Sequence, residues 1–363
     1  MKDQIPHSKQ TSSQNSSKDT DIFDAISENL KSFVIFRAPE EADAITLWCV
    51  GTYLMDVWQL FPKLLINSPE RECGKTTLLL AIEAMVQNGM IASSITPAAI
   101  YRIIENQQPT LLIDEADRFL RFSEELNGII NAGHTRRTAT RIHCEKNKDG
   151  TIEQKSFSLW GPQVIAGIGG QADTLTSRSI KISLRRKTVY EAVARMPFDH
   201  VERSQIFRDI LTDWAAEKRD LIAQMALDGP TGASDRAQDN WTPLVRIAAA
   251  IGGHWPERAM NAFDKLEIGD KDDTASSIGL DLLRDIQAIM KQNSVLEMGA
   301  AQITKALIIL PDSEWRSIQN GRPITSKRIN QILRDYQIRT VKRRDRNVYL
   351  LADIEDNLLR YIP

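Results

Sequence analysis

The chain has 363 residues, 42% hydrophobic and 26% charged, a composition that supports two or three folded domains and excludes wholesale disorder. A net charge of −2 excludes a uniformly basic nucleic-acid-binding surface, so any such surface must be local. The three cysteines are widely spaced, which indicates reduced thiols, and no apolar run is long enough for a signal core or a membrane span. We therefore expect a cytoplasmic protein with no membrane partner.

The first elements in chain order are a tail, two helices and a strand. Residues 1–20 are rich in Ser, Gln and Lys and are predicted to be disordered. Helical patterns occupy residues 21 to about 60, and an apolar strand is predicted at 63–67. This strand turns into a helix through a loop that ends in Gly74-Lys75-Thr76.

This loop has the arrangement that a nucleoside triphosphate needs. Backbone N–H groups and the helix N-terminus hold phosphate, the lysine reaches the β- and γ-phosphates, and the threonine hydroxyl completes a Mg²⁺ shell. Pro69 replaces the first glycine of G-x-x-x-x-G-K-[ST], and Glu72 replaces another common glycine. The predicted nucleotide-binding residues are Pro69, Glu70, Arg71, Glu72, Cys73, Gly74, Lys75, Thr76 and Thr77.

A second apolar strand ends in two acids, Asp114 and Glu115. Before it, a helix runs from Thr76 to about residue 87, a strand is predicted at 91–95, and Thr96-Pro97 opens another helix. At the end of a strand beside the phosphate loop, Asp114 is predicted to hold Mg²⁺ with Thr76, and Glu115 to polarise the attacking water. The alternative is a strand that runs into an acid-rich helix N-terminus.

The next segments complete an α/β core. After a helix at 123–132, Asp149-Gly150 predicts a hairpin over 141–154, followed by strands at 163–168 and 179–184. Strand–helix alternation predicts a parallel sheet with helices on both faces. Residues 188–267 have helical patterns with a break at 228–235, and a charged linker at 269–273 precedes a further unit at 275–363.

Together these motifs resemble the AAA+ ATPases. More narrowly, the stretches 66–69, 73–76, 166–169 and 239–244 are similar to an ATPase domain of uncharacterised function in plasmid, phage and integrative-element proteins, often next to primase or helicase parts. The resemblance covers about residues 22–267. It implies a P-loop core with its N-terminal helices at 21–187, a helical lid at 188–268, ATP and Mg²⁺ as cofactors, and a homo-oligomer, most simply a hexameric ring.

The resemblance also implies catalytic arginines. Arg178 stands where an arginine finger would reach the γ-phosphate bound by a neighbouring subunit, a role suited to a planar, permanently charged guanidinium. Arg258 is predicted to contribute from the lid, with Arg236 as a competitor; a surface arginine or a lid salt bridge is the alternative for each. The strand at 163–168 ends in glycines where an Asn or Thr often positions water, so Gln171 is a candidate substitute and hydrolysis is expected to be slow.

Basic residues are concentrated near the C-terminus. Between Arg316 and Arg346 there are ten Lys or Arg residues against two acids. An amphipathic helix at 324–334 followed by strands at 340–342 and 348–351 resembles a winged-helix DNA-binding domain; a solvated charged helix is the alternative. The predicted DNA-binding residues here are Lys327, Arg328, Gln331, Arg334, Arg343, Arg344 and Arg346.

The hairpin at 141–154 is a second candidate for DNA contact. In ring helicases of this class, such a hairpin points into the central pore. Its tip would carry Lys146 and Lys148, with Arg136 and Arg137 at its base, although it could equally be an ordinary extension of the sheet.

The sequence therefore predicts an ATP-hydrolysing protein of a mobile element that forms a ring and acts on DNA as a replication helicase or translocase. One alternative is a DNA-binding NTPase switch, such as an initiator, a loader or a phage-defence ATPase, that does not unwind processively. Another is a non-hydrolysing DNA-binding adaptor. A primase, nuclease or other replication or defence protein would be an additional partner.

Overall fold

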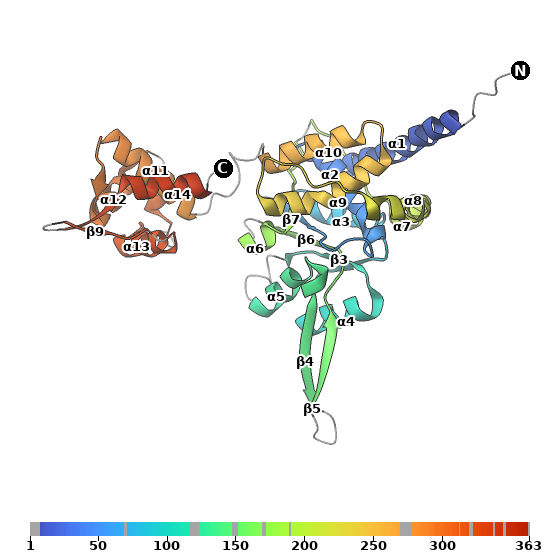
Figure 1. The fold of residues 1–363 in the computed structure, drawn as a ribbon, viewed down its shortest axis with the longest axis horizontal. Helices are drawn as coiled ribbons and strands as arrows, with labels where there is room; N and C mark the ends of the chain where they lie inside the picture. The colour runs from blue at the N-terminus through green and yellow to red at the C-terminus, as the bar shows by residue number, and fades with distance from the viewer. Residues whose placement is uncertain are drawn as a thin grey trace, which may run out of the picture. The chain divides into compact units, whose positions relative to one another are not determined.

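The computed structural model describes residues 8–68, 71–116, 123–146, 152–168, 172–188, 190–268, 278–311, 313–318, 322–336, 338–343 and 346–361. They form two compact units, Met1–Lys271 and Asp272–Pro363 (Figure 1). Each unit has a hydrophobic core of its own.

Two helices open the first unit. Helix α1 spans Ser8–Phe33, and α2 spans Glu40–Gly51 with almost every side chain buried. The helix thus starts earlier than the predicted boundary of the tail at residue 20, whereas residues 1–7 lie outside the described part. The reason is that Ser, Gln and Lys are acceptable helix residues, and the packed half of α1, with Phe23, Ile26 and Leu30 buried, provides a helix onto which further turns can be added.

The core of this unit is the predicted parallel sheet, which has five strands in the order β2-β3-β6-β1-β7. Its strands read as short continuous apolar runs because both faces of the sheet are covered. β2 begins earlier than the predicted strand at 91–95, because Met90 pairs with Leu111. The strands are β1 (Lys63–Ser68), β2 (Gly89–Ala92), β3 (Thr110–Ile113), β6 (Gln163–Ile168) and β7 (Ser179–Ser183).

Short helices connect these strands. α3 (Lys75–Glu83) follows β1, α4 (Pro97–Gln107) follows β2, α5 (Glu124–Ala132) follows β3, and α6 (Asp173–Thr176) precedes β7. The predicted cap of α4 is present, since the Thr96 hydroxyl accepts the N–H of Ala99 at 3.3 Å.

The predicted hairpin is also present. β4 (Thr140–Lys146) pairs with β5 (Ile152–Ser158) in antiparallel register, and the ribbon extends away from the sheet (Figure 1). Its turn, including Lys148, lies outside the described residues.

The helices after β7 share a core with the sheet. They are α7 (His200–Arg203), α8 (Gln205–Gln224), α9 (Asp235–Ile251) and α10 (Trp255–Phe263), followed by a π-helical turn at Asp264–Ile268. Trp241 and Phe263 belong to the same hydrophobic cluster as Trp48 of α2 and Leu64 of β1. The predicted lid is therefore packed within the first compact unit.

The second unit combines helices with a small antiparallel sheet. In chain order it contains α11 (Ile278–Gln292), β8 (Glu297–Met298), α12 (Ala300–Ile309), α13 (Ser326–Asp335), β9 (Val341–Lys342), β10 (Asn347–Leu350) and α14 (Leu351–Tyr361). Its sheet has the order β8-β10-β9. The predicted helix and two following strands are present, while the winged-helix assignment stays a prediction.

Candidate nucleotide site

The loop between β1 and α3 has the backbone geometry of a glycine-rich turn. Gly74 has φ +88°, and a Cβ there would lie 3.0 Å from Val34, so glycine is required. Glu72 has φ +62°, a left-handed conformation that costs a non-glycine residue on the order of 1–3 kcal/mol. The exposed Glu72 carboxylate pairs with Arg186, which links the loop to the segment after β7. Pro69 and Glu70 lie outside the described residues.

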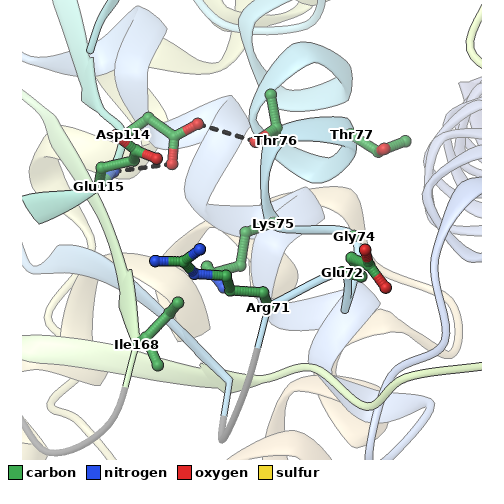
Figure 2. Close-up of a pocket in the computed structure, with 9 residues that line it drawn as sticks. All are labelled: Arg71, Glu72, Gly74, Lys75, Thr76, Thr77, Asp114, Glu115 and Ile168. Carbon is green, nitrogen blue, oxygen red and sulfur yellow. Dashed lines mark hydrogen bonds between the residues drawn. The ribbon is translucent and has the colours of Figure 1, made fainter. Parts of the chain in front are cut away.

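The side chains predicted to handle phosphate and metal converge on one cavity. The Lys75 ammonium donates to the Ser68 hydroxyl at 2.6 Å. The Thr76 hydroxyl donates to the Asp114 carboxylate at 2.8 Å (Figure 2). The cavity has a volume of about 370 Å³, within the range of ligand pockets. It is lined by Arg71, Glu72, Gly74, Lys75, Thr76, Thr77, Asp114, Glu115 and Ile168.

The two acids reach this cavity from beyond a neighbouring strand. β6 lies between β1 and β3, yet Asp114 extends from the end of β3 to Thr76. The backbone N–H of Glu115 donates to the Asp114 carboxylate at 2.8 Å, and Glu115 itself has φ +52°. A carboxylate and a hydroxyl in contact are hard oxygen ligands, so Asp114 and Thr76 fit Mg²⁺. Positive φ at a residue in the cavity is typical of a functional position.

Arg71, one of the predicted nucleotide-binding residues, and Ile168, which was not predicted, both line the cavity. The Arg71 guanidinium extends between Lys75 and Ile168, which adds a second cation to the phosphate region (Figure 2). Ile168, at the end of β6, is apolar, although a polar side chain that positions water is expected at the end of this strand. The candidate for that role, Gln171, lies outside the described residues.

A second cavity, of about 250 Å³, shares Glu72, Gly74 and Thr77 with the first. One wall is the end of α1 with Val34 and Ile35, and the other is the segment that contains Met196. Backbone hydrogen bonds hold these walls together, from Ala194 N–H to Ser32 O at 2.7 Å and from Arg185 N–H to Ile35 O at 3.2 Å. The lining combines apolar side chains with the charged ones of Glu72, Arg185, Lys187 and Arg195, and a slot of this kind suits a flat heterocycle with polar edges. The sequence carried no local signal for it, because its walls come from distant segments.

Arg178 lies away from the first cavity, which Lys75, Thr76 and Asp114 line. It is half-buried at the start of β7, where its guanidinium donates to Thr174 O at 2.8 Å. Burial and the neighbouring Arg236 lower its pKa. Arg236 donates to the Ser177 hydroxyl at 3.2 Å, so the two arginines form a pair at one surface. Arg178 is not among the described residues that line the cavity, and its action on a neighbouring subunit stays a prediction.

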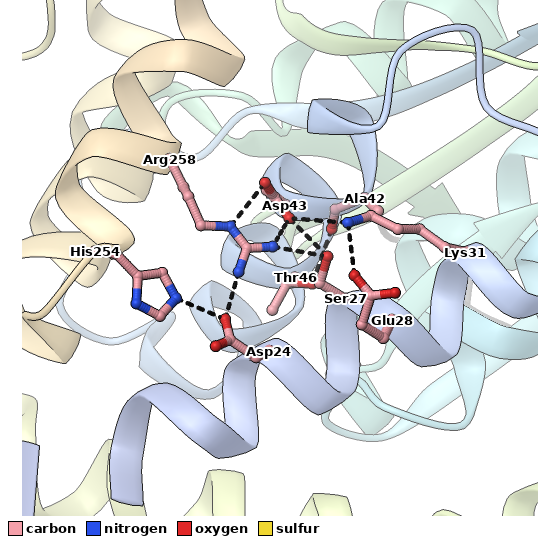
Figure 3. A network of polar contacts seen from close by, with 9 residues as sticks. All are labelled: Asp24, Ser27, Glu28, Lys31, Ala42, Asp43, Thr46, His254 and Arg258. Atoms are coloured by element: carbon pink, nitrogen blue, oxygen red, sulfur yellow. Dashed lines mark hydrogen bonds and ion pairs between the residues drawn. The ribbon is translucent and has the colours of Figure 1, made fainter. Parts of the chain in front are cut away.

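Arg258 does not occupy the position predicted for it. Its guanidinium binds Asp43 of α2 and Asp24 of α1 and donates to the Ser27 hydroxyl at 3.2 Å (Figure 3). It also stacks 4.3 Å over the Trp255 ring. Arg258 is not among the described residues that line the cavity. The salt-bridge alternative is the observed one, because carboxylates from two distant helices capture the side chain.

Breaking this network should destabilise the first unit. Arg258→Ala would leave Asp43, which is 8% exposed, without its bidentate partner. We expect a loss of about 2–4 kcal/mol in the free energy of unfolding, near the lower end of the range for buried pairs. Urea denaturation checks this. The control is Arg203→Ala, which removes an exposed pair with Asp199 and should leave the free energy of unfolding nearly unchanged. Equal stabilities of the two variants would contradict the assignment.

Two arginines at the base of the hairpin bond to partners within the chain. Arg136, at its base, donates to Asp56 O at 2.9 Å, and Arg141 pairs with Glu125 at 2.5 Å. Ile142 and Ile152 are 63% and 74% exposed on the ribbon. Arg137 is exposed, whereas the side chain of Lys146 and the whole of Lys148 lie outside what the structure describes.

In the second unit, α13 has the predicted amphipathic orientation. Ile329, Ile332 and Leu333 are buried. The outward side chains are Lys327, Gln331 and Arg334, with Arg328 half-buried and bonded to Gln331 at 3.0 Å.

The basic residues of the β9–β10 segment have an unanticipated acidic neighbour. Glu297 of β8 pairs with Arg343 at 2.7 Å and with Arg346 at 3.9 Å. Arg344 lies outside the described residues. Arg316 instead donates to the carbonyls of Ile308 and Leu310 at the end of α12.

Parts of the sequence match a protein family and a curated protein. A family described as "Protein of unknown function (DUF3631)" matches residues 183–361. An "Uncharacterized 28.9 kDa protein in xis 5'region" of Saccharopolyspora erythraea is 27% identical over 134 residues, which are 36% of this chain and 50% of that protein. The chain thus spans about half the length of this curated relative.

Solved structures with detectable similarity are more distant. A full-length MCM homolog from Methanopyrus kandleri has a TM-score of 0.43 at 10% identity, covering 74% of this chain and 63% of that one. The structure titled "SCCmec type IV Cch - active helicase" has a TM-score of 0.45 at 12% identity, covering 86% and 68%. Among the described residues, no helix is long and apolar enough to cross a bilayer.

Proposed function

We propose that the chain binds and hydrolyses ATP with Mg²⁺. The observation that carries this proposal is the convergence on one cavity of Lys75, the Thr76–Asp114 pair and Glu115. Lys75 and Arg71 offer cations to the phosphate chain, and the N-terminus of α3 faces the same space. The adjoining cavity would take the base, between Val34 and Met196.

The residues divide the chemistry among them. Lys75 neutralises charge on the phosphates, and exchanges its hydrogen bond with Ser68 for one with the nucleotide. Thr76 and Asp114 would hold Mg²⁺, which supplies charge neutralisation on the β- and γ-phosphates when bound. Glu115 accepts a proton from the attacking water, whose in-line approach needs the space beside Ile168.

We further propose that the protein acts on DNA in a homo-oligomeric ring, as a helicase or translocase of a mobile element. Three features support this: the half-buried Arg178 at a surface away from its own nucleotide cavity, the projecting hairpin, and the basic outward face of α13. The apolar Ile168 in the cavity favours a second candidate, a slow NTPase switch on DNA, because no described polar side chain at this point positions water.

The direct test measures ATP turnover with and without DNA, together with the particle mass in the presence of ATP. The proposal expects a multimer whose turnover rises with DNA. Lys75→Ala serves as the negative control. A forked duplex then separates the two candidates: strand displacement supports the helicase, whereas turnover without displacement supports the switch. A monomeric protein without turnover under all these conditions would refute both.

The second unit should carry much of the DNA affinity. Removing residues 275–363 leaves the core of the first unit intact, since the clusters are separate. Each lost phosphate contact reduces the slope of log affinity against log salt by about 0.9, and we expect a loss of about three to five contacts. Affinities at several salt concentrations measure this. An unchanged slope would place DNA elsewhere, most simply at the hairpin.

Point variants sharpen this test. Lys327→Ala and Gln331→Ala on α13 should alter sequence preference, if there is one, and Arg343→Ala should weaken all sequences alike. Glu297→Gln removes the carboxylate beside Arg343 and Arg346, so it should increase affinity and steepen the slope. The matched control is Lys291→Ala on α11, whose partner is Glu355. No response of the slope to Glu297→Gln would exclude these arginines from the interface.

A further inference from the structure

Four buried polar side chains lie at the amino-terminal ends of the central strands, the ends opposite the nucleotide cavity. They are Lys63, Gln163, His134 and Asn240, and we call them the buried polar cluster; none is more than 6% exposed. Lys63 and Gln163 immediately precede the paired residues Leu64 and Val164, so they start neighbouring strands. The Lys63 ammonium and the Gln163 amide have no hydrogen-bond partner among the described residues. Such groups are costly to bury, so an apolar core would be more stable here.

Hydrogen bonds determine how Asn240 is oriented. Its amide nitrogen donates to Ser177 O at 3.1 Å, and a carbonyl can only accept. The amide oxygen therefore faces His134 Nε2, 2.8 Å away, and this ring nitrogen must be the donor. Burial lowers the pKa of His134 to about 4; the hydrogen bond that His134 donates to Asn240 acts in the opposite direction, and the nearby charges of Lys63 and Arg178 lower the pKa further. His134 is thus neutral near pH 7 and holds the Asn240 amide in a single orientation.

The residue that Asn240 holds is next to Arg178. The Ser177 carbonyl accepts a hydrogen bond from Asn240, and the Ser177 hydroxyl accepts one from Arg236. Both donors come from α9. On the other side, the Lys63 N–H donates to Arg178 O at 2.9 Å. Hydrogen bonds from both β1 and α9 therefore hold the Ser177–Arg178 turn in place.

Helix α9 is itself anchored to the last strand of the sheet. The fully buried Trp241 donates from its indole to Glu267 at 3.2 Å, and Glu267 pairs with Lys181 of β7 at 3.4 Å. Adjacent residues of one helix thus bind the turn before β7 directly and β7 itself through Glu267. A movement of α9 would be transmitted to the Arg178 backbone without a flexible intermediate.

We propose that Asn240, oriented by its hydrogen bond with His134, is a positioning residue that holds Arg178 for action on the nucleotide of a neighbouring subunit. This inference rests on the proposed function, because Arg178 must act in trans. It adds a route by which the helix that packs over the core of a subunit controls the arginine that this subunit presents to its neighbour.

Mixing experiments with inactive variants test the direction of this effect. Asn240→Ala keeps its own Lys75 and Glu115 but should misplace its Arg178, so it should bind ATP with unchanged affinity and turn it over at least tenfold more slowly. Mixed with Lys75→Ala, which presents an intact Arg178, it should recover activity. Mixed with Arg178→Ala, it should remain inactive. The matched control is Asp239→Ala, an exposed neighbour on α9, which should behave as the unaltered protein.

Other outcomes would overturn the inference. Recovery with Arg178→Ala rather than with Lys75→Ala would show that Asn240 serves its own nucleotide cavity, and recovery with neither would indicate a general defect. Asn240→Asp, which keeps the acceptor for His134 and removes the donor to Ser177, repeats the test if the alanine variant does not fold. Full turnover in a folded Asn240 variant would refute the role of Asn240 and leave the proposed function standing. Absence of turnover in the unaltered protein removes the proposed function as well.

Discussion

Glu115→Gln should bind ATP with unchanged affinity and hydrolyse it about 10²–10⁴-fold more slowly, the contribution of a positioned general base. Glutamine has the shape of glutamate, but it cannot accept the proton of the attacking water. Because Glu115 adopts φ +52°, its side chain is directed by a strained backbone, and the isosteric change leaves that backbone in place.

Lys75→Ala should instead lose nucleotide affinity, since Lys75 lines the proposed nucleotide cavity. Nucleotide affinity by calorimetry and turnover by phosphate release separate the two effects. The matched control is Glu124→Gln, the same substitution at an exposed position in the first turn of α5. Normal turnover by Glu115→Gln would exclude this carboxylate from the reaction.

Arg178→Ala should retain nucleotide affinity and lose about 10³–10⁵-fold in turnover, the contribution of an arginine that stabilises the transferred phosphoryl group. The expectation follows from its place, half-buried beside Arg236 and away from the cavity of its own chain. In a mixture with Lys75→Ala, some interfaces would combine an intact loop with an intact arginine, so activity should return.

Arg203→Ala is the control for this experiment, because Arg203 is an exposed arginine of α7 that pairs with Asp199. Its turnover should match that of the unaltered protein. If mixtures of Arg178→Ala and Lys75→Ala co-assemble and yet stay inactive, Arg178 does not act across a subunit interface.

Predictions from local pattern were the most successful. The strands of the parallel sheet, the Thr96 cap and the buried face of α13 follow from apolar periodicity and capping chemistry, which depend on near neighbours in the chain. The meeting of Thr76 with Asp114 was also foreseeable, because the carboxyl ends of parallel strands lie at one edge of a sheet.

Arginine roles were harder to predict because a long charged side chain takes whichever partners the fold brings to it. Arg258 was expected at the phosphates, yet it is held by Asp24 and Asp43, more than two hundred residues earlier in the chain. Arg343 was expected to contact DNA from a basic segment, and the structure adds an acidic neighbour, Glu297 from β8.

The sequence by itself determined the α/β core, its phosphate loop and the amphipathic helix α13, because these are written in residue types at short, regular spacing. Only the tertiary structure decided the walls of the second cavity, the partners of Arg258 and the burial of Lys63, His134 and Asn240. These features assemble residues from remote segments, and their energies depend on which charges and amides become enclosed together when the helices pack on the sheet.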